Sequence, residues 1–168
     1  MYVQLVTTGH QKKLRTLFLV CVLSAWAFTS NGQQKIEYGS NNGKYISILN
    51  TKLYYEEYGK GAPLILLQGG MGSIADFSLC IPELSKNFRI IAPDTPGQGR
   101  SELADSMSYP LMAEYFSRMI DILKLDNAYV IGWSDGGNAA LILGNNRPDR
   151  IKKVLVSGAN YLLSGYPS

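Results

Sequence analysis

Short apolar runs alternate with segments of helical character along most of the chain. Continuous apolar runs of this kind are typical of strands that are covered on both faces. They lie at residues 64–67 and 128–131, and two further strands are predicted at residues 88–93 and 153–157. Helices are predicted between them, at residues 74–84, 109–125 and 138–143. Strands that alternate with helices predict a parallel sheet with right-handed crossovers.

The residues before this alternating region predict a leader and a β-hairpin. Residues 45–49 and 53–58 are rich in apolar and aromatic side chains, and the polar residues 50–52 between them predict a turn. Residues 31–43 are polar and contain glycine, so we expect a flexible leader. The folded domain is therefore predicted to span residues 44–168.

The first 30 residues have the pattern of an export signal. Basic residues within positions 12–15 precede an apolar stretch at 16–28, which is short for a membrane span. An Ala-Trp-Ala sequence at 25–27 is one candidate cleavage site, and residues 30–32 are a second. We expect a signal peptide at residues 1–30 and export to the periplasm or the exterior. An uncleaved membrane anchor is the alternative.

Composition excludes two broad classes of protein. Of the 168 residues, 46% are hydrophobic and 17% are charged, which indicates a globular domain and not a disordered chain. The net charge of +3 comes from Lys12, Lys13 and Arg15, because the other 13 basic residues match the 13 acidic ones. A nucleic-acid-binding surface is therefore not predicted. Outside the predicted signal Cys80 is the one cysteine, so we expect no internal disulfide and a small core residue.

The strongest chemical signal is the stretch GWSDG at residues 132–136, which has the form G-x-S-x-G. It joins the predicted strand at 128–131 to the predicted helix at 138–143. A serine on such a turn needs neighbours without side chains, because strand and helix must pack closely around it. The helix N-terminus supplies N–H groups and a positive dipole end, which favour a developing anion. The pattern predicts that Ser134 is a nucleophile.

Three motifs, taken in this order, resemble those of the α/β-hydrolase fold family over roughly residues 44–160. They are LILLQGGMG at 64–72, DTPGQGRS at 94–101 and GWSDGG at 132–137. The resemblance implies an α/β fold in which helices cover both faces of a mostly parallel sheet. It also implies that Ser134 attacks an ester or related acyl substrate through a Ser-His-Asp mechanism, with no metal or other cofactor. The expected partner is a small-molecule substrate, and membrane contact is expected only through the export segment.

The resemblance also implies an oxyanion hole. One expected donor is the backbone N–H of Asp135, directly after the serine. The other is the N–H of Gly70, with Met71 as the alternative. Gln68 stands where the family usually has a structural histidine, and its amide can make some of the same hydrogen bonds. Asp94 is expected to organise the loop beside the site.

Other side chains near these motifs have open roles. The carboxylate of Asp135 either faces solvent at the helix N-terminus or holds a cationic group of a substrate. Trp133 is expected beneath or beside the pocket. Tyr109 and Phe77 are expected in the core or at the pocket rim.

The acid and the histidine of a triad are missing from this sequence. The family order is Ser, then Asp or Glu, then His, but the single histidine is His10. Asn160, after the predicted sixth strand, cannot be the anionic partner. We therefore expect a fold truncated after about the sixth strand, and a chain that is inactive or nearly so alone. An unpaired apolar edge at residues 154–156 would favour aggregation.

Three functions follow from these observations. The first is the amino-terminal part of an exported serine hydrolase. The second is a truncated, non-catalytic protein of this fold that binds a ligand or partner. The third is a cofactor-free perhydrolase that uses the same triad.

Overall fold

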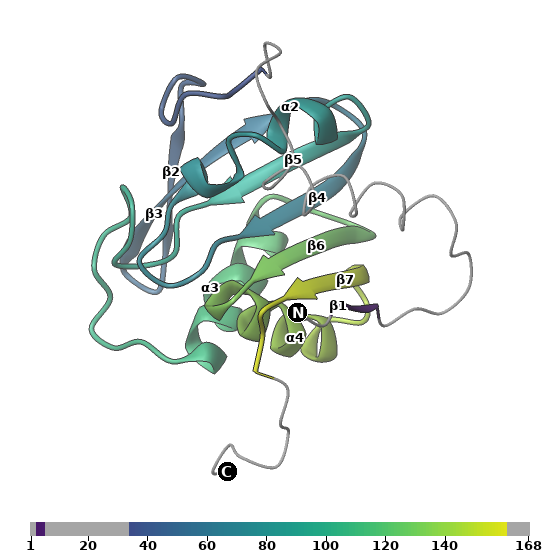
Figure 1. The fold of residues 1–168 in the computed structure, drawn as a ribbon. Helices are drawn as coiled ribbons and strands as arrows, with labels where there is room; N and C mark the ends of the chain where they lie inside the picture. The colour runs from purple at the N-terminus through teal and green to yellow at the C-terminus, as the bar shows by residue number, and fades with distance from the viewer. Residues whose placement is uncertain (1–2, 6–33, 161–168) are drawn as a thin grey trace.

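The computed structural model describes residues 3–5 and 34–160 of the chain (Figure 1). The predicted export signal at residues 1–30 lies outside the described residues, except for Val3–Leu5. The strands are β1 (Val3–Leu5), β2 (Lys44–Ile48), β3 (Thr51–Tyr58), β4 (Ala62–Leu67), β5 (Phe88–Pro93), β6 (Ala128–Trp133) and β7 (Ile151–Ser157). The helices are the 3-10 helix η1 (Ile74–Phe77) and the α-helices α2 (Ile81–Leu84), α3 (Tyr109–Ile122) and α4 (Asp135–Asn146). Within this described part, no helix is long and apolar enough to cross a membrane.

The strands form one mixed sheet in the order β1-β7-β6-β4-β5-β3-β2. The central strands β7, β6, β4 and β5 run parallel to one another. At one edge β3 and β2 are antiparallel additions, and at the other edge β1 is antiparallel to β7. The prediction of a mostly parallel sheet is confirmed. The carboxyl ends of the central strands therefore meet at one side, where open α/β sheets bind ligands.

Helices cover both faces of this sheet, as predicted (Figure 1). On one face α3 and α4 pack on the sheet through fully buried side chains such as Phe116 and Leu143. On the other face η1 and α2 contribute Ile74 and Ile81 to a second buried cluster. The central strands are apolar on both sides because both clusters bury them.

The hairpin forms, but its turn lies earlier than predicted. Ile48 pairs with Thr51, so the loop consists of Leu49 and Asn50 alone. Both have positive φ, at 48° and 62°, which is the geometry of a two-residue turn that follows the twist of the strands. Leu49 extends the apolar run in the sequence, yet its side chain is exposed. Because Leu49 is apolar, the sequence assigned it to the strand and placed the turn at residues 50–52, one residue too late.

The single helix predicted over residues 74–84 is divided into η1 and α2. Ser73 caps η1, and its hydroxyl and the Asp76 carboxylate form a reciprocal capping box. Pro82 lies in the first turn of α2, where its missing N–H costs no helical hydrogen bond. The prediction of one continuous helix over residues 74–84 is therefore wrong, because Pro82 favours the start of a second helix.

The described part of the predicted flexible leader, residues 34–43, is bound to the domain. The Tyr38 hydroxyl donates to the Asp94 carboxylate. The N–H of Gly39 donates to the Glu56 carboxylate at 2.9 Å. These bonds reach the sheet and the loop that follows β5, so this stretch is part of the folded domain and not a free linker.

The edge of β7 is also covered, in contrast to the expected unpaired strand. Residues 3–5 of β1 pair antiparallel with residues 155–157 of β7. Val156 thus has a backbone partner in Gln4. Among the described residues, the apolar edge that was predicted to favour aggregation is shielded along this part.

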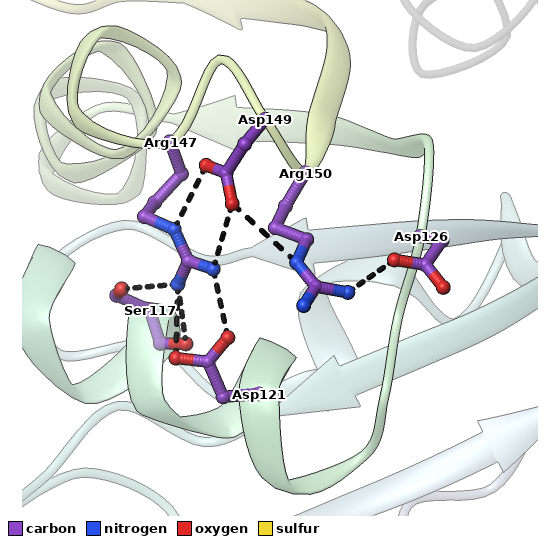
Figure 2. A network of polar contacts seen from close by, with 6 residues as sticks. All are labelled: Ser117, Asp121, Asp126, Arg147, Asp149 and Arg150. Carbon is purple, nitrogen blue, oxygen red and sulfur yellow. Dashed lines mark hydrogen bonds and ion pairs between the residues drawn. The ribbon is translucent and has the colours of Figure 1, made fainter.

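Arg147 connects the carboxyl end of α4 to α3 (Figure 2). Its guanidinium donates to both carboxylate oxygens of Asp121 at 2.7 and 3.1 Å and to the Ser117 hydroxyl at 2.8 Å. It also pairs with Asp149, which in turn contacts Arg150. Hydrogen bonds to Asp121 above all, and then to Asp149, raise the pKa of Arg147. The network fixes the carboxyl end of α4 against α3.

Candidate active site

Ser134 lies at the junction of β6 and α4, at the carboxyl side of the parallel strands. Its φ of 51° and ψ of −118° form a backbone conformation that ordinary residues rarely adopt. Two hydrogen bonds hold it there. Its N–H donates to the Ser157 carbonyl at 2.9 Å, and its carbonyl accepts from the Asn138 N–H at 3.1 Å. The strained turn that G-x-S-x-G predicts is thus present, and Ser134 itself is half-buried.

The two glycines of the motif permit close backbone packing. A Cβ on Gly132 would lie 2.4 Å from the carbonyl oxygen of Gly136, at the start of α4. A Cβ on Gly136 would lie 2.3 Å from the Leu67 carbonyl oxygen and 2.4 Å from that of Gln68, at the end of β4. Both contacts are with backbone atoms, which cannot rotate away. The glycines bring the strand, the helix and the neighbouring strand close together around Ser134.

The loop after β4 runs beside the serine. A Cβ on Gly69 would lie 3.2 Å from the Ser134 Cβ, so the backbone itself borders the nucleophile. The next residue, Gly70, adjoins the Asp135 carboxylate, where a Cβ would lie 2.3 Å from Oδ2. Asp135 is the first residue of α4, and the N–H groups of a first helical turn have no carbonyl partner inside the helix. Gly70 and Asp135 are well placed for the expected oxyanion donors, and that role stays a prediction.

Gln68 is completely buried behind this loop. With its amide oriented to match its neighbours, the nitrogen donates to the Pro93 carbonyl at 2.8 Å. The oxygen then accepts from the Thr95 N–H at 2.8 Å and from the Thr95 hydroxyl at 3.3 Å. Gln68 therefore joins the loops that follow β4 and β5 by both ends of one amide.

Asp94 is the second buried connection between these loops. Its carboxylate accepts from the N–H of Ile74 at 2.9 Å, from the N–H of Arg100 at 2.8 Å and from the Tyr38 hydroxyl. Burial raises the pKa of Asp94, and the three donors oppose that shift only in part. The carboxylate of Asp94 is thus occupied by three hydrogen bonds and holds the loop after β5 in place, as expected.

A cavity of about 970 Å³ is lined in part by Asp135, the residue that follows Ser134 at the start of α4. Its lining comes from the loops after β4 and β5, from the segment before α3 and from Asp135. The Tyr109 hydroxyl donates to Asp135 Oδ1 at 2.8 Å, so both side chains lie together in its wall. Tyr109 is therefore a residue of the pocket wall. The open question whether Asp135 holds a cationic group is not tested by this geometry.

Two further predicted residues lie away from the cavity lining. Trp133 is 49% exposed and lies beside Gly69 and Gly158. Phe77 is buried in the core cluster on the η1 and α2 side, so it is a core residue. Cys80 is a partly buried cysteine packed against the same cluster, just before α2.

Sequence reasoning missed Glu56, a buried carboxylate that is 1% exposed. It accepts from the hydroxyl of Tyr54 at 2.8 Å, from the hydroxyl of Tyr58 and from the N–H of Gly39. Burial, followed by the bond to Glu56, raises the pKa of Tyr58. The alternation of a strand could have found this group, because residues 54, 56 and 58 share one face.

The triad is incomplete within the described residues. Neither 3–5 nor 34–160 contains a histidine. After β7 the chain continues through Gly158 and Ala159 to Asn160, whose N–H donates to the buried Asn138 side chain at 3.0 Å. The side of Ser134 that faces these residues thus carries no base and no carboxylate partner in the part that the structure describes.

Comparison with known proteins places these features among hydrolases. Residues 62–167 match the model of the alpha/beta hydrolase fold family. The chain is 30% identical over 122 residues to a 2-hydroxymuconate semialdehyde hydrolase of Pseudomonas sp. strain CF600, covering 70% of this chain and 43% of that protein. It is 32% identical over 125 residues to the human serine hydrolase BPHL, covering 68% of this chain and 42% of that protein.

Solved structures agree with these sequence relatives. A marine microorganism esterase superimposes with a TM-score of 0.60 and 36% identity, over 62% of this chain and 40% of that one. The chain therefore spans less than half the length of the relatives that it matches.

Proposed function

Because the chain belongs to the α/β-hydrolase fold family, we propose that it is the nucleophile-bearing part of a serine hydrolase that cleaves an ester or related acyl substrate. Ser134 is the nucleophile, and the N–H groups of Gly70 and Asp135 receive the oxyanion. The histidine and acid of the triad belong to residues outside these 168. The single observation that carries the proposal is the strained conformation of Ser134 between β6 and α4.

The reaction runs in two steps. Ser134 Oγ attacks the carbonyl carbon while the histidine takes its proton, and the carbonyl oxygen becomes an oxyanion. Collapse of this intermediate breaks the ester bond, and the histidine returns the proton to the leaving alcohol. Water then attacks the acyl-serine by the same route and releases the carboxylic acid. The chain's own contribution is the fixed nucleophile and the two backbone donors.

Labelling with a fluorophosphonate probe tests this proposal. The full-length protein should be labelled at Ser134, located by mass spectrometry of the labelled peptide, and Ser134→Ala should remove the label. Ser73→Ala is the matched control, because its hydroxyl is occupied in the cap of η1. An unlabelled, folded full-length protein would contradict the proposal.

A non-catalytic binding protein is the second candidate, favoured by the absence of any histidine after Ser134 in this sequence. The 168-residue chain itself distinguishes the two. Stoichiometric labelling of Ser134 in this chain at neutral pH would contradict the binding-only reading. Perhydrolase chemistry uses the same nucleophile but transfers the acyl group to hydrogen peroxide. If the protein is a perhydrolase, adding hydrogen peroxide together with an ester should produce a peracid.

We also propose that the protein is exported through the apolar segment at residues 16–28. The basic residues before this segment and the small residues after it support the proposal. Expression of the full gene followed by amino-terminal sequencing of the periplasmic or secreted fraction tests it. An intact amino terminus in the cytoplasmic fraction would contradict it.

A further inference from the structure

The cavity lined in part by Asp135 carries an inference about the substrate, which rests on the proposed function. We propose that it takes a neutral, apolar acyl group and excludes acyl groups that end in an anion. The proposal follows from the side chains that line the cavity, from the charge among them and from the position of that charge.

Flexible apolar side chains dominate the lining. Met71, Leu103, Met107 and Met112 contribute to it, together with two prolines. Met71 is 99% exposed and Leu103 is 80% exposed, although both are large and apolar. Exposed apolar groups gathered around one hollow mark a binding surface. Methionine adapts its shape to a ligand, so a set of alkyl chains can be held without one fixed fit.

The charge among the described lining residues of the cavity is negative. Asp135 is the only charged residue of the described lining, and no lysine or arginine contributes to it. A carboxylate on the ligand that lies along this lining would lose its hydrating water and would approach the carboxylate of Asp135. The Tyr109 hydroxyl is already donated to Asp135, so it does not offset that repulsion. A neutral alkyl group meets none of these costs.

The position of Asp135 relates the cavity to the reaction. Asp135 directly follows Ser134, and Gly70 with Met71 continues from the loop that borders the serine. A carbonyl carbon at Ser134 Oγ would thus place one substituent of the substrate along this lining. Leu103 and Met107 belong to the same lining, so a substituent that extends along it meets apolar side chains.

A pair of esters with the same acyl length tests the proposal. Methyl hexanoate is neutral, and monomethyl adipate carries a carboxylate at the far end. Both are titrated against the Ser134→Ala protein, which does not consume them, and binding is followed by saturation-transfer NMR. We expect methyl hexanoate to bind about tenfold more tightly. Equal binding, or tighter binding of monomethyl adipate, would overturn the proposal.

Two further variants assign the preference to this cavity. Asp135→Asn should reduce the preference toward unity, because an amide keeps the hydrogen bond from Tyr109 and loses the charge. Asp105→Asn is the matched control, since Asp105 is exposed on the same segment and does not line the cavity. Met107→Lys should improve binding of monomethyl adipate several-fold. A preference that survives Asp135→Asn unchanged, with no response to Met107→Lys, would contradict the assignment.

This test and that of the proposed function can fail separately. If Ser134 is labelled in the full-length protein but the anionic ester binds as well as the neutral one, the hydrolase proposal stands and the substrate class is wrong. If the neutral preference holds and Ser134 is never labelled, the cavity binds apolar groups in a protein that does not hydrolyse them.

Discussion

Replacing Gly136 by alanine should destabilise the protein, because the new Cβ would meet two backbone oxygens. It would lie 2.3 Å from the Leu67 oxygen and 2.4 Å from the Gln68 oxygen. Both distances are more than half an ångström shorter than 3.0 Å, the shortest contact that Cβ atoms make in proteins. Overpacking of this kind costs about 1–3 kcal/mol. Alanine gains up to about 1 kcal/mol over glycine in a helix. Because the helix gain offsets part of the overpacking cost, the net loss of folding free energy should be about 1 kcal/mol.

Gly137→Ala is the matched control, one residue further along the same helical turn. It has a similar gain in helix propensity, but its nearest contact is the Ala159 Cβ at 3.0 Å, and the Gly132 oxygen follows at 3.4 Å. Its free energy of unfolding should stay within about 0.5 kcal/mol of the parent. Urea unfolding followed by circular dichroism measures both variants. If the two variants are equally stable, the argument that Gly136 is needed for the approach of α4 to β4 is wrong.

Two other changes probe the support of the site. Asp94→Asn should lower the free energy of unfolding by about 2–4 kcal/mol, because one amide oxygen cannot accept from both Ile74 and Arg100 and a buried N–H then faces the NH2 group. Thermal unfolding measures this loss. A loss no larger than that of the exposed Asp76→Asn would refute the reasoning. Arg147→Met should cost about 1–2 kcal/mol through its lost bonds to Asp121 and Ser117. The exposed Arg118→Met, which loses one surface ion pair, should cost under about 0.5 kcal/mol in the same urea titration, and equal losses would mean that the Arg147 network contributes little.

Local patterns predicted the elements around the nucleophile well. The run at 128–131 extends to Trp133 in β6, and the strand at 88–93 matches β5 residue for residue. These segments have buried apolar runs bounded by glycine or proline, so local preference and tertiary burial agree. The alternation of strands and helices was enough to predict the parallel sheet, and the resemblance carried by the three motifs implied helices on both of its faces.

Features that depend on distant partners were not predicted. The burial of Glu56 depends in part on the docked leader, because the N–H of Gly39, 17 positions earlier in the chain, donates to its carboxylate. The pairing of β1 with β7 joins residues 3–5 to residues 155–157, and the sequence pattern of a signal peptide carries no such register. Leu49 misled the turn assignment because tertiary geometry placed an apolar residue in a left-handed, exposed position.

The three donors on Asp94 have a consequence for motion. One carboxylate holds the start of η1, the loop after β5 and Tyr38 of the leader. If any one of these segments opened alone, the buried carboxylate of Asp94 would lose a hydrogen-bond donor, so we expect the three segments to open together as one cooperative unit. Two walls of the cavity are thereby fixed to each other. Freedom to admit a ligand must then come from the exposed side chains of Leu103 and Met107 on the segment before α3, which none of these bonds restrains.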